Sequence, residues 1–174
     1  ITLTLTTSGG SWGTTTDTKS ITVNANPTAD AGSAVSAICQ GATSGAMGGS
    51  VAGGATGGTW SGGGGTWTNA TDLANATYTA SAGESGSITL TLTTSGGSCA
   101  TTTDTKSITV NANPTADAGS SVSAICQSST SGAMGGSVAG GATGGTWSGG
   151  AGTWTNPTDL ANATYTASSG ESGS

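Results

Sequence analysis

The chain has 174 residues, including 33 glycines and 36 threonines, and its two basic and eight acidic residues give a formal net charge of −6. This charge argues against nucleic acid and anionic membranes as partners, because both attract a cationic protein surface. No apolar run approaches the roughly 20 residues that span a bilayer. Histidine is absent and the acidic residues do not cluster, so we expect neither catalysis nor a cofactor.

An internal repeat organises the chain. Residues 1–87 align with residues 88–174 without a gap, and eight of the 87 positions differ. Most of these differences exchange one small residue for another, whereas Trp12 stands at the position of Cys99. A near-identical repeat of this length is typical of tandem domains.

The turn signals place the domain boundaries out of phase with the repeat as it is written. Asn-Pro pairs at Pro27 and Pro114 each follow a predicted strand and open a new segment, as short interdomain junctions do. We therefore predict three regions, namely the last two strands of a preceding domain at 1–26, a complete domain at 27–113, and a domain lacking its last two strands at 114–174.

In chain order, the first predicted elements are two strands joined by a turn, in ITLTLTTSGGSWGTTTDTKSITV. Apolar residues alternate with threonine in the first strand, which is the pattern of a strand with one buried face. The apolar residues of this pair are our candidate polymerisation residues: Ile1, Leu3, Leu5, Ile21 and Val23. In the second copy, Lys106 shares the inward parity of Ile108, so we expect a β-bulge near Ser107 or an early exit from the sheet.

The next predicted elements are short strands separated by glycine-rich turns. Val35 and Cys39 share one face of a strand, and TWSGGGGTWT predicts a hairpin that sets Trp60 opposite Trp67. ATYTAS supplies a further strand around Tyr78. Roughly seven or eight such strands without helical periodicity favour an all-β fold of tandem immunoglobulin-like antiparallel β-sandwich domains.

The three cysteines bear on how such a domain is held together. Cys39 and Cys99 lie on an early and a late predicted strand, a spacing that suits a disulfide between the two sheets of a sandwich. This bridge would stabilise the domain by about 4 kcal/mol in the chain-entropy treatment; the alternative is two buried free thiols. Cys126 is the equivalent of Cys39, and we expect it to be unpaired within the chain. If residues 1–26 of a neighbouring subunit completed its domain, Cys126 would face Trp12.

Several motifs together resemble a known family: NPTADAGS, AICQG, GGTWSGGGGTWTNATDLANATYTAS and ITLTLTTSGGSCATTTDTKSITVNANP. They are similar to the tandem immunoglobulin-like (PKD-like) repeats of giant secreted surface proteins of Bacteroidota, including gliding-associated adhesins exported by type IX secretion. The resemblance covers the whole chain and implies β-sandwich domains, an extracellular location and a structural or adhesive role. Trp12, at the family's second cysteine position, departs from the pattern and puts the disulfide of that unit in doubt.

Three ligand-binding interpretations stand beside the structural one. Asp30 and Asp117 follow the domain junctions and are weak calcium candidates, because a calcium ion usually takes several carboxylates. Tryptophan pairs that could stack on a glycan are Trp60, Trp67, Trp147 and Trp154. The threonine rows of ITLTLTT and TTTDTK could bind ice if they stacked in register, although Asp104 and Lys106 interrupt the second row.

We therefore expect a non-enzymatic structural repeat of an extracellular bacterial surface filament or adhesin stalk. Its partner would be the chain itself, either head-to-tail along a filament or covalently within a longer array. The alternative is a module that binds glycan or ice and is displayed on such a rod.

Overall fold

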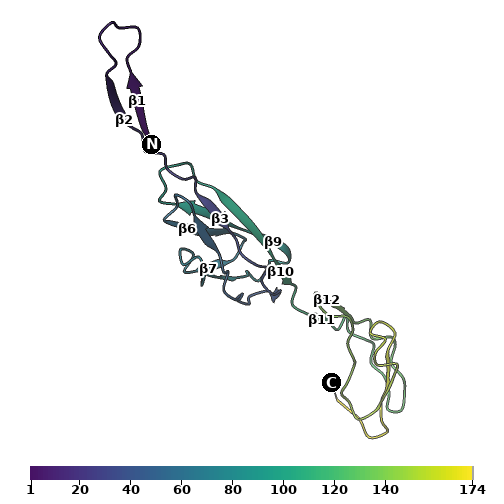
Figure 1. Ribbon diagram of the computed structural model, residues 1–174. Helices are drawn as coiled ribbons and strands as arrows, with labels where there is room; N and C mark the ends of the chain where they lie inside the picture. Colours follow the sequence, from purple (N-terminus) through teal and green to yellow (C-terminus); the bar gives the residue numbers. More distant parts are fainter. Residues whose placement is uncertain (174) are drawn as a thin grey trace. The chain divides into compact units, whose positions relative to one another are not determined.

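The computed structural model describes residues 1–173, and these residues form strands and turns without a helix (Figure 1). They therefore contain no helix long and apolar enough to cross a membrane. The predicted all-β class is confirmed, and the several packed sheets are consistent with a β-sandwich.

The chain divides into two compact units. The first comprises Ile1–Ser36, Thr43–Thr79 and Ile88–Ile108, and the second comprises Ala37–Ala42, Ala80–Ser87 and Thr109–Ser174. The second unit thus includes short segments that precede Pro114, so the units differ from the predicted regions. The domain boundaries at 26/27 and 113/114 stay predictions.

The first two strands form the expected hairpin. β1 (Thr2–Thr6) pairs antiparallel with β2 (Thr16–Ser20), and Leu5 lies opposite Asp17. Every residue of both strands is exposed. The hairpin is therefore held by its own backbone hydrogen bonds and not by a packed core.

The largest sheet has four strands, in the order β4-β10-β9-β6. These are β4 (Ile38–Cys39), β10 (Thr103–Asn111), β9 (Gly86–Ser95) and β6 (Gly57–Gly62). β6 pairs antiparallel with β9, and β4 pairs parallel with the last residues of β10. β9 and β10 carry the sequence of β1 and β2 a second time, so one sequence occurs both inside a sheet and in an exposed hairpin.

Short two-stranded sheets complete both repeats in the same way. The pairs are β3 (Thr28–Asp30) with β5 (Ser50–Ala52), β7 (Thr66–Thr68) with β8 (Thr77–Thr79), β11 (Thr115–Asp117) with β12 (Ser137–Ala139), and β13 (Thr153–Thr155) with β14 (Thr164–Thr166). Registers agree between the repeats, since Trp154 lies opposite Tyr165 as Trp67 lies opposite Tyr78. These small sheets form whether or not a long strand pair lies beside them.

The core gathers on the inner face of the four-stranded sheet. Its largest fully buried side chains are Trp60, Tyr78, Met47, Leu90, Leu92, Ile108, Val110 and Thr94. Four of the aliphatic ones are the alternating residues of β9 and β10 that the sequence pattern places inward. Burying one such side chain stabilises a fold by roughly 1.5–3 kcal/mol. The strand pair therefore supplies a large part of a small core.

The predicted hairpin of Trp60 and Trp67 is wrong. Trp60 lies in β6 and pairs with β9, whereas Trp67 lies in β7 and pairs with β8. Between them Gly62 and Gly63 take positive φ angles of 97° and 73°, which glycine adopts at little cost. The chain there passes from one sheet to another. The two indole rings nevertheless stack, with 5.8 Å between their centroids.

The predicted bulge near Ser107 and its alternative, an early exit from the sheet, are also wrong. β10 alternates regularly between exposed and inward residues, and Lys106 lies on the inner face with 8% of its surface exposed. Its ammonium group donates to the carbonyls of Ser33, at 2.8 Å, and Met47, at 2.5 Å. A buried cation with hydrogen-bond acceptors is tolerated, so the strand stays regular.

The predicted disulfide between Cys39 and Cys99 is absent, and both residues are free thiols, as is Cys126. Cys39 pairs with Asn111 at the end of β10, whereas Cys99 precedes the start of that strand. The nine residues of β10, at about 3.3 Å each, hold those ends roughly 26 Å apart. A disulfide needs Cα atoms within about 7 Å. The two cysteines thus lie at opposite ends of one strand.

Candidate assembly site

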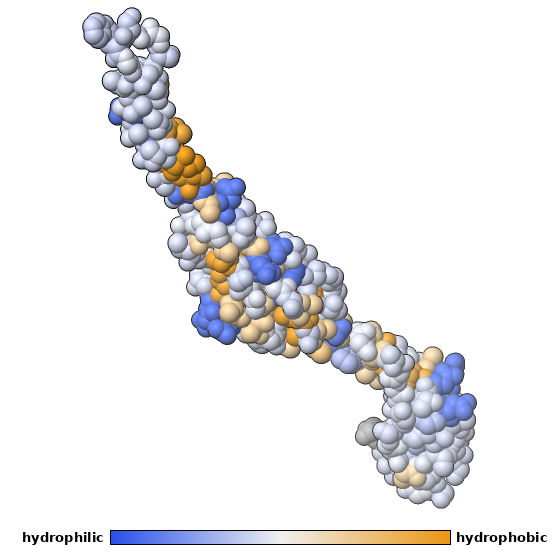
Figure 2. Space-filling model, in the orientation of Figure 1, coloured by the Kyte–Doolittle hydropathy of each residue, from blue (hydrophilic) through white to orange (hydrophobic). Residues whose placement is uncertain are grey.

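The apolar face of the N-terminal hairpin is open to solvent. Figure 2 shows hydrophobic residues gathered on part of the hairpin surface. The five candidate polymerisation residues are 47–77% exposed: Ile1, Leu3, Leu5, Ile21 and Val23. Four of their counterparts in the second copy are at most 2% exposed: Leu90, Leu92, Ile108 and Val110. Contiguous exposed apolar surface marks an interaction site, and in the second copy the rest of the repeat covers this face.

A carboxylate anchors the strand pair in the complete repeat. Asp104 of β10 accepts hydrogen bonds from the amides of Ala31, at 2.7 Å, and Thr105, at 2.8 Å. These bonds, with a smaller contribution from Lys106, lower the pKa of Asp104. The equivalent Asp17 is exposed and accepts a hydrogen bond from the amide of its neighbour in sequence.

Lys106 is the second polar anchor. Its Nζ lies 5.4 Å from the centroid of the Trp60 ring, a cation–π distance. Burial lowers the pKa of Lys106, and attraction by Asp30 and Asp104 opposes that shift. Lys19, its equivalent in the hairpin, is exposed.

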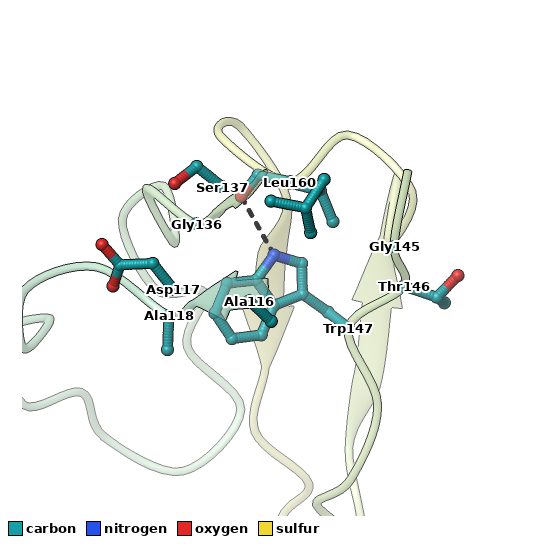
Figure 3. A pocket seen from close by; sticks show the side chains of 10 residues that line it. Ala116, Asp117, Ala118, Gly136, Ser137, Gly145, Thr146, Trp147 and Leu160 are labelled. Carbon is teal, nitrogen blue, oxygen red and sulfur yellow. Dashed lines mark hydrogen bonds between the residues drawn. The ribbon is translucent and has the colours of Figure 1, made fainter. Parts of the chain in front are cut away.

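Residues 114–173 contain a pocket where the complete repeat holds the strand pair. Figure 3 shows Trp147 in this pocket, with its indole N–H donating to the Leu160 carbonyl at 3.0 Å. Gly145 lines the same pocket. In the complete repeat, a Cβ at the equivalent Gly58 would meet Leu92 at 3.4 Å. The pocket is therefore the place that Leu92 fills within residues 27–113.

The two strands that border the strand pair in residues 27–113 have no counterparts in residues 114–173. Residues 144–149 carry the sequence of β6 and residues 125–126 that of β4, yet neither segment is a strand. A strand is defined by backbone hydrogen bonds to a neighbour. Within residues 1–173, no copy of β9 or β10 pairs with these two segments, and such unpaired edges readily recruit another strand.

Two further hollows match other residues of the pair. One is lined by Ile125 and Tyr165, and Ile38, the equivalent of Ile125, pairs with Val110 of β10 in the complete repeat. The other is lined by Ser120 and Met134, the equivalents of the two residues whose carbonyls bind Lys106. Ile125 is 37% exposed. Residues 114–173 thus offer one site for the inward apolar side chains of a strand pair and another for its inward lysine.

Tyr165 borders the larger hollow and is held by a carboxylate. Its hydroxyl donates to Glu171 at 2.6 Å. Burial, followed by this hydrogen bond, raises the pKa of Tyr165, and the same bond lowers the pKa of Glu171. The pair therefore stays a phenol and a carboxylate at neutral pH.

Cys99 and Cys39 both lie beside residues that precede an Asn-Pro junction. The Cys99 thiol donates to the carbonyl of Asn24 at 3.9 Å. Asn111, the equivalent of Asn24, pairs with Cys39, and its carbonyl accepts a hydrogen bond from the Gln40 amide at 3.0 Å. Asn24 is thus approached by Cys99, whereas the equivalent Asn111 is approached by Cys39.

A hollow lies beside Cys39, lined by Asn111, Pro114, Gly140 and Gly141 among others. At the equivalent place within residues 27–113 Pro27 is buried, and a Cβ on Gly97 would meet the Pro27 ring at 3.1 Å. The turn between β9 and β10, which contains Cys99, therefore occupies the corresponding hollow there.

The tryptophan pairs are stacked and partly buried. Trp60 is 2% exposed, and the indole N–H of Trp67 donates to the Gly62 carbonyl at 3.1 Å. Trp147 and Trp154 stack in the same way, 5.8 Å apart, and Trp147 is half-buried at the pocket. The glycan interpretation gains no support from this arrangement.

The two junction aspartates stabilise turns. Asp30 accepts the amide of Gly32, and Asp117 that of Gly119, both at 2.8 Å. Such side-chain bonds to the residue two positions on are typical of Asx turns. Among residues 1–173, no three His, Cys, Asp or Glu side chains gather as a metal site requires.

The outward threonines form a broader row than the sequence indicates. Asp104 lies on the inward-facing side of β10 with buried Lys106, so neither interrupts the outer face as predicted. On that face Thr59 lies opposite Thr93, and Ser61 lies opposite Thr91. Hydroxyl groups therefore continue from β9 onto β6.

Two features of the site escape sequence reasoning. The inward role of Lys106 was visible in its parity, but a lysine between apolar residues suggested an irregular strand. The second feature is that Cys99 lies beside Asn24 while Cys39 lies beside the equivalent Asn111. The sequence did not indicate this, because both cysteines fall inside one predicted domain. Comparison with protein-family models, with curated proteins and with solved structures finds no match.

Proposed function

We propose that the chain is a non-enzymatic structural repeat of an extracellular bacterial surface filament or adhesin stalk, built as a rod of immunoglobulin-like β-sandwich domains. One observation carries the proposal. Residues 27–113 hold the strand pair and its covering sheets together, whereas 1–26 and 114–173 present the same two parts separately, with matching faces open. Parts that belong to successive domains suit a repeating array, in which each unit contacts its neighbours along the chain.

The surface chemistry supports a structural role. Outward positions of β6, β9 and β10 are threonine, serine, glycine and one asparagine, which keep a sheet soluble without a charged ligand site. The fully buried leucine, isoleucine and valine residues all belong to the strand pair itself. Stability of each domain then depends on supplying that pair, either from the next segment of a longer array or from another copy in a filament.

Electron microscopy tests this function. Negative-stain images of the native material, combined with a denaturing, non-reducing gel, should show extended rods or filaments. Rods that run as one very large chain indicate a covalent array, and rods that dissociate to about the 16.1 kDa of this chain indicate separate subunits. Discrete particles without rods would refute the structural role.

A second candidate is an ice-binding surface displayed on the same rod. The observation that favours it is the hydroxyl row from Thr91 and Thr93 across to Ser61 and Thr59. Thermal hysteresis and ice recrystallisation assays test it, with Thr91→Lys as the disrupting variant. Ice activity that is absent, or unchanged in that variant, would leave the threonines as ordinary strand formers.

A further inference from the structure

We propose that the β1–β2 hairpin of one copy, the donor, inserts into residues 114–173 of a second copy, the acceptor, and that the donor's Cys99 and the acceptor's Cys126 then form a disulfide. This inference rests on the proposed function and names its partner as a second copy of this chain. We infer the docked arrangement from residues 27–113, where the second copy of the hairpin sequence already packs against the first copy of the acceptor sequence.

The apolar fit follows position by position. Donor Leu5 takes the place of Leu92 and enters the acceptor pocket between Trp147 and Gly145, which the equivalent Trp60 and Gly58 form around Leu92. Donor Leu3, Ile21 and Val23 correspond to Leu90, Ile108 and Val110 and cover the hollow at acceptor Ile125 and Tyr165. Docking would thereby bury the exposed apolar faces of both copies.

The polar fit is equally specific. Donor Lys19 takes the place of Lys106, so its ammonium group reaches the acceptor carbonyls of Ser120 and Met134. Donor Asp17 takes the place of Asp104 and accepts the acceptor amide of Ala118. A hydrophobic patch alone would accept many partners, whereas a cation and a carboxylate at fixed places select this strand pair in one register.

The backbone of both parts is prepared for docking. The hairpin already has the cross-strand register and the closing bonds of its counterpart, since the Thr7 amide donates to the Thr15 carbonyl at 3.0 Å, as Thr94 does to Thr102 at 2.9 Å. On the acceptor, residues 144–149 would become a strand against donor β1, as β6 is against β9. Little reorganisation of the hairpin is needed.

The cysteine prediction follows from the junction. Within the donor, the Cys99 thiol lies 3.9 Å from the Asn24 carbonyl. In the docked register, acceptor Cys126 pairs with donor Asn24 as Cys39 pairs with Asn111. The Asn111 carbonyl accepts the Gln40 amide at 3.0 Å, so in the docked register the Asn24 carbonyl is approached by the donor Cys99 thiol and by the residue after acceptor Cys126. Laterally paired strand residues are about 5 Å apart, which places acceptor Cys126 beside Asn24 and brings the two cysteines to the same residue.

The same register places Trp12 away from acceptor Cys126, so the expectation that these two residues would face each other is not met. The donor turn that carries Trp12 would occupy the acceptor hollow at Pro114 and Gly140, beside acceptor Cys39. Trp12 is 97% exposed in the undocked hairpin. Because it stands where Cys99 stands in the other repeat, this second contact between the copies is filled by an indole ring and carries no disulfide.

Bond formation needs an oxidant, for which we use glutathione disulfide. The donor Cys99 thiolate attacks one sulfur of glutathione disulfide and releases one glutathione thiolate. The acceptor Cys126 thiolate then attacks the Cys99 sulfur and releases the second glutathione thiolate. The two cysteine protons end on the two reduced glutathione molecules, so two thiols are oxidised and one disulfide is reduced.

The test combines light scattering with non-reducing gels. The 174-residue chain should associate as concentration rises and, with glutathione disulfide, give a ladder in steps of 16.1 kDa. Leu5→Asp should remain monomeric, and Thr4→Asp, on the outer face of the same strand, should assemble normally. Cys99→Ser or Cys126→Ser should abolish the ladder but keep the assembly, and Cys39→Ser should change neither.

A gain-of-function variant sharpens the register. Trp12→Cys introduced together with Cys99→Ser should restore the ladder through Cys39, and adding Cys39→Ser should remove it again. Complementation tests the trans arrangement: Leu5→Asp keeps an intact pocket, and Gly145→Val fills the pocket while leaving an intact hairpin. Neither alone should associate, whereas their mixture should give a species of twice the monomer mass.

Several outcomes overturn the inference. These are a chain that is monomeric at every concentration, assembly that survives Leu5→Asp, a ladder that requires Cys39 in the wild-type chain, assembly without any ladder, and a Cys99–Cys126 disulfide within a monomer. Failure of the proposed function is a separate result. Rods that persist with Leu5→Asp refute only the inference, whereas ladder-forming oligomers that never build rods refute only the function.

Discussion

The hairpin of residues 1–26 and the strand pair of residues 88–113 have nearly the same sequence but opposite environments. In the hairpin Leu5 is 77% exposed, and in the pair the equivalent Leu92 is fully buried. Local pairing is the same in both, so alternation of apolar and polar residues is sufficient for the two-stranded ladder. Burial depends on the covering sheets. The comparison separates what a strand pair forms by itself from what a domain adds to it.

The largest difference between the two regions should appear with Lys106→Glu. The substitution buries a negative charge against the carbonyls of Ser33 and Met47 and should destabilise the repeat by about 4 kcal/mol. Lys19→Glu, at the exposed equivalent, should change stability by less than about 0.5 kcal/mol in the unassociated chain. Urea denaturation followed by tryptophan fluorescence measures both. Equal effects would mean that Lys106 is not an inner-face residue.

Leu92→Ala comes next. Removing this buried side chain should cost about 3 kcal/mol, because the transfer term and a residual cavity add. Leu5→Ala in the unassociated chain should be close to neutral. Differential scanning calorimetry of both variants, at a concentration where the chain does not associate, provides the measurement. A large loss for Leu5→Ala under those conditions would show that the hairpin face is already covered within one chain.

Valine substitutions at the equivalent residues Gly58 and Gly145 test whether the pocket in residues 114–173 is open. A Cβ on Gly58 would lie 2.7 Å from the Thr93 carbonyl of β9, so Gly58→Val should cost roughly 2 kcal/mol through overpacking. At Gly145 the nearest atoms are side-chain atoms of Leu160 and Val138 at 3.4 Å, and valine there should be tolerated. Chemical denaturation compares them. A severe loss for Gly145→Val would contradict an open pocket.

The smallest effect is on acid stability. Hydrogen bonds from Ala31 and Thr105 lower the pKa of Asp104 in the folded protein. The stability contributed by this carboxylate is thus present above its unfolded pKa of about 3.9 and is lost as pH falls through the folded value. Asp104→Asn should be less stable at pH 7 and lose less on acidification to pH 3. An identical acid response in variant and wild type, measured by urea midpoints, would remove Asp104 as an anchor.

Much of the fold followed from periodicity. Alternation located β1, β2, β9 and β10, and the parity of Leu90, Leu92, Ile108 and Val110 correctly gave the inner face. The strand partners of Trp60 and Trp67, which lie in two different sheets, could not be obtained this way, because glycines with positive φ redirect the chain between sheets. Turn-forming residues indicate that a chain turns, but not which strand it meets next.

The site was predictable only in part. The exposed apolar residues of the hairpin were predicted from the sequence. Residues 27–113 contain their own copy of the strand pair, so they leave no place for the hairpin of residues 1–26. The cysteine prediction failed because sequence separation does not report position along a strand: Cys39 and Cys99 flank β10 at its two ends. The polar anchor at Lys106 needed the positions of the Ser33 and Met47 carbonyls, which come from loops distant in sequence.

Hydrogen–deuterium exchange tests most directly whether the hairpin and the pocket are two halves of one domain. At low concentration, amides of β1, β2 and residues 144–149 should exchange rapidly while those of β9 and β10 are protected. As concentration rises, all three segments should gain protection together and approach that of β9 and β10. If the hairpin and residues 144–149 stay unprotected at every concentration, or gain protection independently, the complementarity of the two parts is contradicted.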